Sequence, residues 1–281
     1  NGKDAVYLSV SPQRSFVEMS SAGGGRTYGR PFDMTRRTTT PGGAPAKGLE
    51  TVPRHVAIIM DGNRRWAKAR GIPKALGHRE GVKAVREIVE AAHDMGVEYL
   101  TLYSFSSENW KRPAEEVEDL MGLLRLYIRE DLRKLHAREC RIRVIGSREN
   151  VAPDIVKMID EAETLTRDNK KGTLVLAFNY SGQDEIVEAA RSLARDVAAG
   201  KLAPEAITRE TVEARLTTRG IPHPDLIIRT SGEKRLSNFL IWQSAYAELV
   251  FVDDLWPDFR TKAFAAALAE FNRRERRYGA D

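Results

Sequence analysis

The feature that most constrains the fold is a regular alternation of short apolar runs with amphipathic helical stretches after residue 52. The runs are rich in Val, Ile and Leu, which is typical of strands that are buried on both faces of a parallel sheet. Helical stretches between most of them supply the crossovers that parallel strands need. We therefore predict an α/β fold with a largely parallel sheet covered by helices. The predicted strands are 55–60, 99–105, 141–145, 173–180, 226–229 and 249–252.

Four helices are predicted from the spacing of apolar residues. Residues 81–94 and 114–136 each carry an apolar stripe that repeats every 3.6 residues, as expected for helices packed on a core. Pro113, followed by Glu115 and Glu116, suits a helix start, because carboxylates stabilise the positive end of the helix dipole. Two further helices are predicted at 155–165 and 184–197.

The first fifty residues differ from the rest of the chain. Gly, Pro, Ser and Thr supply 22 of them, and neither a helical nor an alternating period is visible. We interpret residues 1–51 as a disordered or non-native lead, although its basic character also fits a transit peptide. Residues 52–281 are predicted to form one catalytic domain.

Composition excludes several classes of protein. Apolar residues make up 42% and charged residues 30%, which fits neither a disordered nor a membrane-embedded chain. Cys140 is the single cysteine, so an internal disulfide and a cysteine-rich zinc site are excluded. The net charge of +5 is too small to argue for nucleic acid as a partner, but it suits anionic ligands if arginines converge.

Ligands of parallel sheets bind beyond the carboxyl ends of the strands, so the residues that follow each strand are the first candidates for a binding site. The first strand leads into Asp61, Gly62 and a helix start, which together form an anion site. A carboxylate beside an anion requires a cation or an arginine between them, which points to a diphosphate with Mg²⁺. The alternative is an ordinary Asp-Gly-Asn turn with solvated arginines.

Polar residues also follow the second and fifth predicted strands. Residues 103–113 place polar side chains between aromatic ones, although Trp110 could belong to the core and Asn109 could be a helix cap. Arg229 and Arg235 flank a loop with interleaved hydroxyl groups, and guanidinium groups match phosphate oxygens. The alternative is a surface loop whose arginines are balanced by a nearby glutamate.

Two isolated residues are also candidates. Glu248 precedes the last strand and is either a solubilising group or a second metal ligand. We expect His78 to open a helix, where it can donate a hydrogen bond to a phosphate or act only in capping and packing.

Five sequence blocks together carry a resemblance to a known family. In order and in spacing they resemble the signature blocks of the cis-prenyltransferases, and most closely the bacterial undecaprenyl diphosphate synthases. The resemblance extends over about residues 52–279. The blocks are residues 55–67, 77–78, 103–113, 229–239 and 242–248.

The resemblance implies a fold, a reaction and an assembly. The fold is a parallel six-stranded sheet with surrounding helices and an apolar product tunnel, assembled as a homodimer. The reaction is Mg²⁺-dependent, repeated condensation of isopentenyl diphosphate onto an allylic diphosphate, usually farnesyl diphosphate, with each new double bond cis. The product is a long polyprenyl diphosphate such as undecaprenyl diphosphate, the precursor of a lipid carrier for cell-wall synthesis.

The resemblance also implies roles for individual residues. Asp61 binds Mg²⁺ and assists departure of the diphosphate, Glu248 completes the metal site, and Asn109 helps to remove a proton. The implied substrate-binding residues are Gly62, Asn63, Arg64, Arg65, Trp66, Lys74, His78, Ser106, Ser107, Glu108, Trp110, Arg112, Arg229, Arg235, Leu236 and Ser237.

Four positions depart from the family pattern. Arg64 replaces a common glycine, and Lys74 replaces a frequent arginine and loses its two-point contact. Lys234 stands where some members have a histidine suggested as a metal ligand, so the metal is expected to depend on Asp61 and Glu248. Ser104 stands where alanine is common, and its small size is compatible with an open tunnel.

Two other functions remain as alternatives. One is a non-catalytic accessory subunit of a heteromeric prenyltransferase, which the retained acidic and basic residues disfavour. The other is a phosphate-transfer or nucleotide enzyme, which rests on analogy of fold alone. We expect a cytoplasmic protein that can also lie peripherally on the inner membrane face, because the implied product is a lipid. The basic run at 273–277 could contact anionic lipid or form a solvated helix face.

Overall fold

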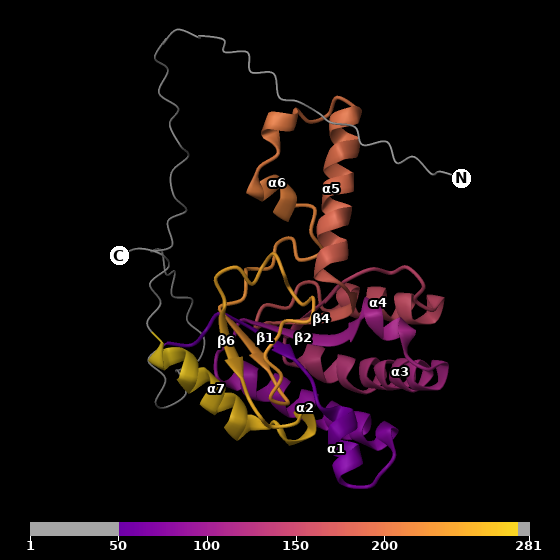
Figure 1. Ribbon diagram of the computed structural model, residues 1–281, viewed down its shortest axis with the longest axis vertical. Coiled ribbons are helices and arrows are strands. Elements are labelled where there is room, and N and C mark those ends of the chain that lie inside the picture. Colours follow the sequence, from indigo (N-terminus) through magenta and orange to yellow (C-terminus); the bar gives the residue numbers. More distant parts are fainter. Residues whose placement is uncertain (1–50, 275–281) are drawn as a thin grey trace, which may run out of the picture. The chain divides into compact units, whose positions relative to one another are not determined.

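The computed structural model describes residues 51–274, and a six-stranded parallel sheet lies at the centre of this part of the chain (Figure 1). The strand order is β3-β4-β2-β1-β5-β6, and every neighbouring pair is parallel. The predicted parallel sheet and all six predicted strands are confirmed. The strands are β1 (His55–Ile59), β2 (Tyr99–Ser106), β3 (Arg141–Ile145), β4 (Thr173–Tyr180), β5 (Leu226–Arg229) and β6 (Glu248–Phe251).

The strand register decides which loops meet. Ile59 at the end of β1 lies opposite Tyr103 on β2 and opposite Arg229 at the end of β5. Tyr103 in turn lies opposite Ala177 on β4. The segments that follow these strands therefore leave the sheet at one common edge, where ligands of parallel sheets bind.

Helices cover one face of the sheet. Alternate strand residues such as Ile58, Leu102 and Ile228 are fully buried there against Ile88 and Phe264. Figure 1 shows α2 and α7 along this side, with α3 and α4 beside them. These helices are α1 (Asn63–Ala69), α2 (Lys74–Asp94), α3 (Ala114–Ala137), α4 (Pro153–Leu165) and α7 (Thr261–Arg273).

The opposite face is covered mainly by irregular segments. Ala57 and Ile227 pack there with Ile221, Phe239 and Leu240 from the segments that flank β5. The long helix α5 and the short α6 contact each other and extend away from the sheet (Figure 1). The remaining elements are α5 (Gly182–Ala198), α6 (Arg209–Glu213) and the 3₁₀ helices η1 (Ser107–Lys111), η2 (Pro204–Ala206) and η3 (Trp256–Asp258).

The helix predictions were right in position but incomplete. The helix predicted at 81–94 begins earlier, at Lys74 after Pro73, so His78 lies one turn inside α2 and does not open it. Gly77 and Gly81 interrupt the apolar stripe and obscure this first part of the helix. Helices α6 and α7 were not predicted, although the buried residues of α7 do follow the helical spacing.

The predicted lead and the predicted domain both include residues at the ends of the chain that the structure does not describe. The predicted lead at 1–51 lies outside the described residues except for Thr51, and so do the last residues of the predicted domain, 275–281. Between residues 51 and 274, the helices are too short or too polar to cross a membrane.

Candidate active site

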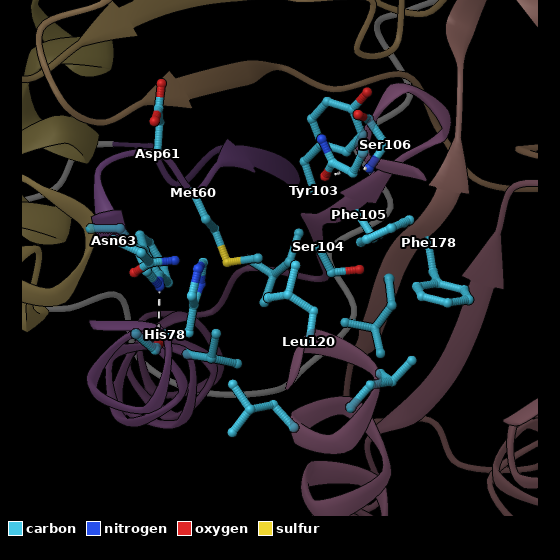
Figure 2. A pocket seen from close by; sticks show the side chains of 18 of the residues that line it. Met60, Asp61, Asn63, His78, Tyr103, Ser104, Phe105, Ser106, Leu120 and Phe178 are labelled. Atoms are coloured by element: carbon cyan, nitrogen blue, oxygen red, sulfur yellow. Dashed lines mark hydrogen bonds between the residues drawn. The ribbon is translucent and has the colours of Figure 1, made fainter. Parts of the chain in front are cut away.

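A cavity of about 320 Å³ opens at the carboxyl edge of the sheet, between β2 and helices α2 and α3. Its volume lies within the ordinary range for small-molecule sites. Figure 2 shows Asp61, Asn63 and His78 on one side of the cavity, with Phe105, Leu120 and Phe178 on the other. The cavity therefore combines a polar mouth with an apolar interior. The apolar lining includes Val82, Val85, Leu102, Phe105, Leu120, Met121, Leu124 and Phe178.

Asp61 and Arg229 form an ion pair at the mouth of this cavity. The Arg229 Nη2 donates to Asp61 Oδ2 over 2.9 Å, and the Arg229 side chain is only 4% exposed. Their closeness follows from the register, because Asp61 comes two residues after Ile59, which lies opposite Arg229. The ion pair places one negative and one positive group beside the same opening.

Thr230 fixes the backbone of Asp61. Its hydroxyl oxygen accepts from the Asp61 N–H over 2.8 Å and lies 2.7 Å from the Asp61 carbonyl oxygen, to which it can donate. Thr230 is fully buried, so these hydrogen bonds are shielded from water. The turn that carries Asp61 is thereby held to the end of β5.

Charge around Asp61 keeps its carboxyl group ionised. Burial by itself raises the pKa of the Asp61 carboxyl, but the hydrogen bond and charge of Arg229 and the charge of Arg65 outweigh burial and lower that pKa. The Arg65 guanidinium lies 3.6 Å from Asp61 and 3.3 Å from Glu233. Asp61 is thus a carboxylate with arginines on two sides, and its side chain remains 33% exposed.

The buried Arg229 also organises the loop after β5. One of its terminal nitrogens donates to the Ser237 hydroxyl over 2.7 Å and to the Arg235 carbonyl oxygen. Its Nε atom is buried and has no hydrogen-bond partner among the described residues. A buried donor without a partner is costly, so this N–H is available to a ligand that enters the cavity.

The junction of α1 and α2 leaves two more polar atoms without partners. In the described part of the chain, Asn63 Oδ1 and His78 Nε2 are buried and make no hydrogen bond, and both residues line the cavity. Burial, followed by the charge of Arg112, lowers the pKa of His78, so its imidazole is neutral near pH 7. These atoms provide unused hydrogen-bonding capacity beside the helix start.

The short helix η1 brings a further amide to the cavity. Asn109 Oδ1 accepts from the Ser106 N–H over 3.2 Å, which closes a capping box, and both residues line the cavity. Asn109 therefore does act as a cap, which was one of the open interpretations. Its amide nitrogen is not used by this cap.

The structure brings eight of the nineteen predicted site residues to one cavity. Gly62 and Arg65 do not line it but adjoin Asp61. The predicted site residues that line the cavity are Asp61, Asn63, His78, Ser106, Asn109, Arg112, Arg229 and Ser237.

Two predicted tryptophans take part in packing and lie outside the cavity lining. Trp110 donates to Asn179 Oδ1 over 2.8 Å and packs edge-on against Phe105. Trp66 donates to Asp258 Oδ1 over 2.7 Å. The other predicted site residues outside the lining are Arg64, Lys74, Ser107, Glu108, Arg235, Leu236 and Glu248.

Glu248 is not brought to Asp61 within one chain. It begins β6 opposite Leu226, the first residue of β5, whereas Asp61 adjoins the last residue of β5. Glu248 pairs instead with Arg274 over 2.9 Å. Within one chain the two carboxylates therefore lie at opposite ends of the strands, and the expected role of Glu248 as a second metal ligand stays a prediction.

Sequence reasoning did not select two residues that shape the site. Thr230 is not among the predicted site residues, although it directly follows the fifth predicted strand. Tyr103 lines the cavity and stacks on Phe239 at 4.5 Å, and burial raises the pKa of its phenol. The position of both residues at or near the carboxyl end of a predicted strand was a signal in the sequence that could have identified them as site residues.

The donor set fits Mg²⁺ only together with a ligand that supplies oxygen atoms. Within residues 51–274 no group of three His, Cys, Asp or Glu side chains could hold a metal ion. Mg²⁺ is commonly bound by one or two carboxylates plus substrate phosphates and water. The ionised Asp61 carboxylate, one-third exposed, meets that requirement for one ligand.

Comparison with protein families gives a match over most of the described chain. Residues 59–279 match the family model described as "Putative undecaprenyl diphosphate synthase". An isoprenyl transferase of Agrobacterium fabrum is 56% identical over 236 residues, which cover 84% of this chain and 96% of the relative. An isoprenyl transferase of Brucella suis is 61% identical over 227 residues, which cover 81% of this chain and 89% of the relative.

Solved structures agree with these relatives. Lavandulyl diphosphate synthase from Lavandula x intermedia, in complex with dimethylallyl diphosphate, is 38% identical and superposes with a TM-score of 0.79 over 81% of this chain and 98% of that chain. A "probable undecaprenyl diphosphate synthase" from Campylobacter jejuni is 30% identical, with a TM-score of 0.67 over 82% of this chain and 99% of that chain.

Proposed function

Because the chain belongs to the undecaprenyl diphosphate synthase family of prenyltransferases, we propose that it elongates a prenyl chain on farnesyl diphosphate by adding isopentenyl diphosphate units in the presence of Mg²⁺. The proposed product is a long polyprenyl diphosphate such as undecaprenyl diphosphate, a precursor of the lipid carrier for cell-wall synthesis. Each addition breaks the allylic carbon–oxygen bond and joins the allylic carbon to the terminal alkene carbon of isopentenyl diphosphate. A proton is then lost and a new double bond forms.

One observation carries the proposal. The ion pair of Asp61 with the buried Arg229 lies at the mouth of a cavity whose interior is lined by aliphatic and aromatic side chains. A substrate with a charged diphosphate and a hydrocarbon tail matches both parts of this cavity. A nucleotide or a sugar phosphate would leave its polar portion against the apolar wall, which is unfavourable.

The allylic diphosphate is proposed to lie beside the start of α1. Helix starts attract phosphate groups because their backbone N–H groups are free, and Gly62 takes the left-handed conformation that opens this one. The nearby His78 imidazole is neutral and has a free Nε2, which can donate when that nitrogen carries the proton. Both features favour a diphosphate at this position.

The second diphosphate is proposed to bind at the loop after β5. The Arg229 Nε–H has no partner there, and the Ser237 hydroxyl is held in place by Arg229. Arg235 is 60% exposed and forms an ion pair with Glu233. An exposed ion pair contributes little to stability, so Arg235 can turn toward an incoming diphosphate at small cost.

Asp61 is the residue that would hold Mg²⁺, with diphosphate oxygens as the other ligands. When bound, the ion neutralises charge on the departing diphosphate. Arg229 and Arg65 keep the carboxylate ionised and add positive charge at the same place. Asn109, which is fixed by the Ser106 cap, is proposed to assist proton removal at the rim of the cavity.

An assay with purified protein tests the proposal. With farnesyl diphosphate, radiolabelled isopentenyl diphosphate and Mg²⁺, we expect label to enter a product extractable into organic solvent. Asp61→Ala should lose most of this activity and keep its circular dichroism spectrum. The matched control is Asp154→Ala, which removes an exposed carboxylate paired with Arg125, and neither of these two residues lines the cavity. The absence of labelled product from folded wild-type protein would defeat the proposal.

The same assay tests the accessory-subunit alternative. Activity that appears only after a second, different subunit is added would favour that alternative. The retained Asp61–Arg229 pair and the open cavity support a catalytic chain. We keep the homodimer as part of the proposal, and sedimentation equilibrium would measure it.

We also propose that the protein is cytoplasmic and can lie peripherally on the inner membrane face. A cytoplasmic enzyme with a lipid product is expected to release that product at the inner membrane face. Of the basic run, the described Arg273 and Arg274 are both ion-paired with Glu270, which favours the solvated helix face. Pelleting with anionic vesicles at increasing salt would test for surface binding.

A further inference from the structure

Ser231 adopts an unusual backbone conformation beside the candidate active site. Its φ is 79°, the largest positive value among the described residues other than glycine. A residue with a Cβ atom adopts this left-handed region at a cost in free energy. The backbone on either side is fixed, because the Ser231 N–H donates to the Asp254 carbonyl oxygen over 2.7 Å and the Gly232 N–H donates to that of Val252 over 2.8 Å. Strained residues are concentrated at functional sites, which makes the Ser231 side chain a candidate for a role there.

Both oxygen atoms of Ser231 accept hydrogen bonds from Arg65. The Arg65 Nη2 donates to the Ser231 hydroxyl oxygen, and Nη1 donates to the Ser231 carbonyl oxygen over 3.1 Å. Ser231 is only 6% exposed, whereas the Arg65 side chain is 47% exposed. A buried and fixed residue therefore holds both terminal nitrogens of a half-exposed arginine. Because the guanidinium is planar, two such contacts determine its orientation.

These hydrogen bonds keep Arg65 apart from Asp61. The Arg65 Nη2 that donates to Ser231 lies 3.6 Å from Asp61 Oδ2, which is too far for a hydrogen bond. Arg229, in contrast, donates directly to the same Oδ2 atom over 2.9 Å. Arg229 is thus bonded to the carboxylate, whereas Arg65 is held close to it without a bond.

The Ser231 hydroxyl contacts Asp61 as well. Burial raises the pKa of the Asp61 carboxyl and the two arginines lower it, and a hydrogen bond from the Ser231 side chain lowers it further. A hydroxyl group can accept and donate at once, so this one joins the Arg65 guanidinium to the Asp61 carboxylate. Ser231 does not line the cavity. It can therefore act on a ligand in the cavity only through Asp61 and Arg65.

We propose that Ser231 is a positioning residue that holds Arg65 away from Asp61 and so keeps the exposed side of the Asp61 carboxylate open toward the cavity. Its consequence for catalysis rests on the proposed function, in which this carboxylate is needed where the diphosphate binds. If Arg65 paired directly with Asp61, the carboxylate would have a bonded guanidinium on two sides. An incoming substrate would then have to break one of these ion pairs.

Removal of the Ser231 hydroxyl should let Arg65 close onto Asp61. The Arg65 Nη2 loses its acceptor, and Asp61 Oδ2 lies only 3.6 Å away. Breaking an exposed ion pair changes an equilibrium constant by up to about fivefold. The KM for farnesyl diphosphate should therefore rise about fivefold, whereas kcat should change little, because the pair is broken on binding and before the chemical step.

Steady-state kinetics of two variants test this effect. Ser231→Ala and Ser231→Gly both lack the hydroxyl, and both should show the higher KM with kcat within about twofold of the wild type. In an Arg65→Gln background, Ser231→Ala should have no further effect on KM, because Ser231 acts through Arg65. Asn150→Gly is the matched control. Asn150 also has a positive φ, of 60°, but it is exposed and does not line the cavity, so its KM should equal that of the wild type.

Thermal melts separate positioning from a merely structural role. Glycine adopts a positive φ freely, whereas alanine keeps the Cβ atom, so Ser231→Gly should melt at a higher temperature than Ser231→Ala. The two variants should nevertheless share the same raised KM. A KM that is normal in Ser231→Gly and raised only in Ser231→Ala would follow stability and overturn the inference.

Crystal structures of the wild type and both variants without substrate test the geometry. The distance from Arg65 Nη2 to Asp61 Oδ2 should shorten in the variants from 3.6 Å to about 2.9 Å, the usual length for a charged pair. An Arg65 side chain that keeps its wild-type position in both variants would overturn the inference, even if KM rises.

The outcomes distinguish this inference from the proposed function. A wild-type enzyme that makes product, together with folded Ser231→Ala and Ser231→Gly variants of unchanged KM, would overturn the inference and leave the function standing. A wild-type protein that makes no product would defeat the function. In that case the crystal structures decide about Ser231. Closure of Arg65 onto Asp61 in the variants would support the positioning role, and an unmoved Arg65 would overturn it.

Discussion

Arg229 donates a 2.9 Å hydrogen bond to Asp61 from the neighbouring strand, although 168 positions separate the two residues. The guanidinium is almost completely buried, whereas the carboxylate remains one-third exposed. The exposed side of Asp61 therefore faces the cavity mouth, and its other side is neutralised by Arg229. This arrangement holds the carboxylate ionised without blocking it.

The first prediction concerns Arg229→Gln. Arg229 lowers the pKa of Asp61, so removal of its charge should raise that pKa. If catalysis needs the ionised carboxylate, activity falls as pH decreases through this pKa. The acidic limb of the kcat/KM profile should therefore move to higher pH. At pH 8 we expect kcat/KM to fall at least 30-fold, which corresponds to about 2 kcal/mol for a truncated buried ion pair.

Arg54→Gln is the matched control for this experiment. Arg54 forms an ion pair with Glu98 in which both side chains are more than half exposed. Removal of the Arg54 charge should leave both the acidic limb of the kcat/KM profile and the value of kcat/KM at pH 8 unchanged. An Arg229→Gln profile whose acidic limb coincides with that of the wild type would show that Arg229 does not control the ionisation of Asp61.

The second prediction concerns Thr230→Val, which replaces a hydroxyl with a methyl group of similar size. The Asp61 N–H loses its 2.8 Å acceptor, and the buried hydroxyl is removed. We expect the free energy of unfolding to fall by about 1–3 kcal/mol, because a buried donor is left without a partner. Urea denaturation measures this change, and the turnover rate should fall with it because the turn carries Asp61.

Thr230→Ser separates the hydroxyl from the methyl group. Serine keeps the oxygen that accepts from Asp61, so it should restore turnover to within a few-fold of the wild type. A Thr230→Val protein with wild-type stability and turnover would show that the Asp61 turn is held by other contacts.

The sheet could be predicted from the sequence because its strands are buried on both faces. Runs such as 173–180 contain few polar residues, and their ends coincide with the ends of β4. Helix α1, with seven residues, and helix α6, with five, are too short for a period of 3.6 to be recognised. Their position depends on contacts with other elements.

From the sequence, site residues could be predicted only where they lie at the carboxyl ends of strands that run in the same direction. Asp61 and Arg229 each come at the carboxyl end of a strand, and parallel neighbours bring such ends together. The same rule places Glu248, the first residue of β6, at the opposite edge. The expected metal site of Asp61 and Glu248 came from the family resemblance, and it stays a prediction because this rule concerns one chain only. The hydrogen bonds of Thr230 to the Asp61 backbone could not be predicted, because side-chain partners 169 positions apart are not encoded in spacing.

The third prediction compares two glycines that both lie inside helices. A Cβ atom at Gly77 of α2 would lie 2.3 Å from the backbone oxygen of Asn63, so α1 and α2 could not keep their close packing. A Cβ atom at Gly122 of α3 meets nothing within 4 Å. Gly77→Ala should therefore destabilise the protein by about 1–3 kcal/mol, because backbone must move to relieve the overlap.

Gly122→Ala is the control, with the opposite expected sign. Alanine in an exposed helix position is more favourable than glycine by roughly 0.5–1 kcal/mol. Thermal or urea denaturation of both variants measures the two changes. A stabilising Gly77→Ala substitution would show that α1 can move away from α2 without cost.

The fourth prediction depends on a buried histidine far from the cavity mouth. His55 Nδ1 lies 2.7 Å from the Pro222 carbonyl oxygen, which can only accept, so Nδ1 carries the proton. Nε2 then accepts from the Thr101 hydroxyl over 2.7 Å. Burial lowers the pKa of His55 to about 4, well below its ordinary value of 6.5. The folded protein thus holds this imidazole neutral where the unfolded chain would bind a proton.

Stability should therefore fall as pH decreases from about 6.5 toward 4, because only the unfolded chain gains a proton from this residue over that interval. The full shift corresponds to about 3 kcal/mol, an upper limit for His55 alone. Urea denaturation at pH 7, 6 and 5 should show a smaller loss in His55→Gln, with some slope left because the pKa of His78 is also lowered. The exposed His136→Gln is the control and should keep the wild-type slope. Equal slopes in His55→Gln and the wild type would show that protonation of His55 does not contribute to acid unfolding.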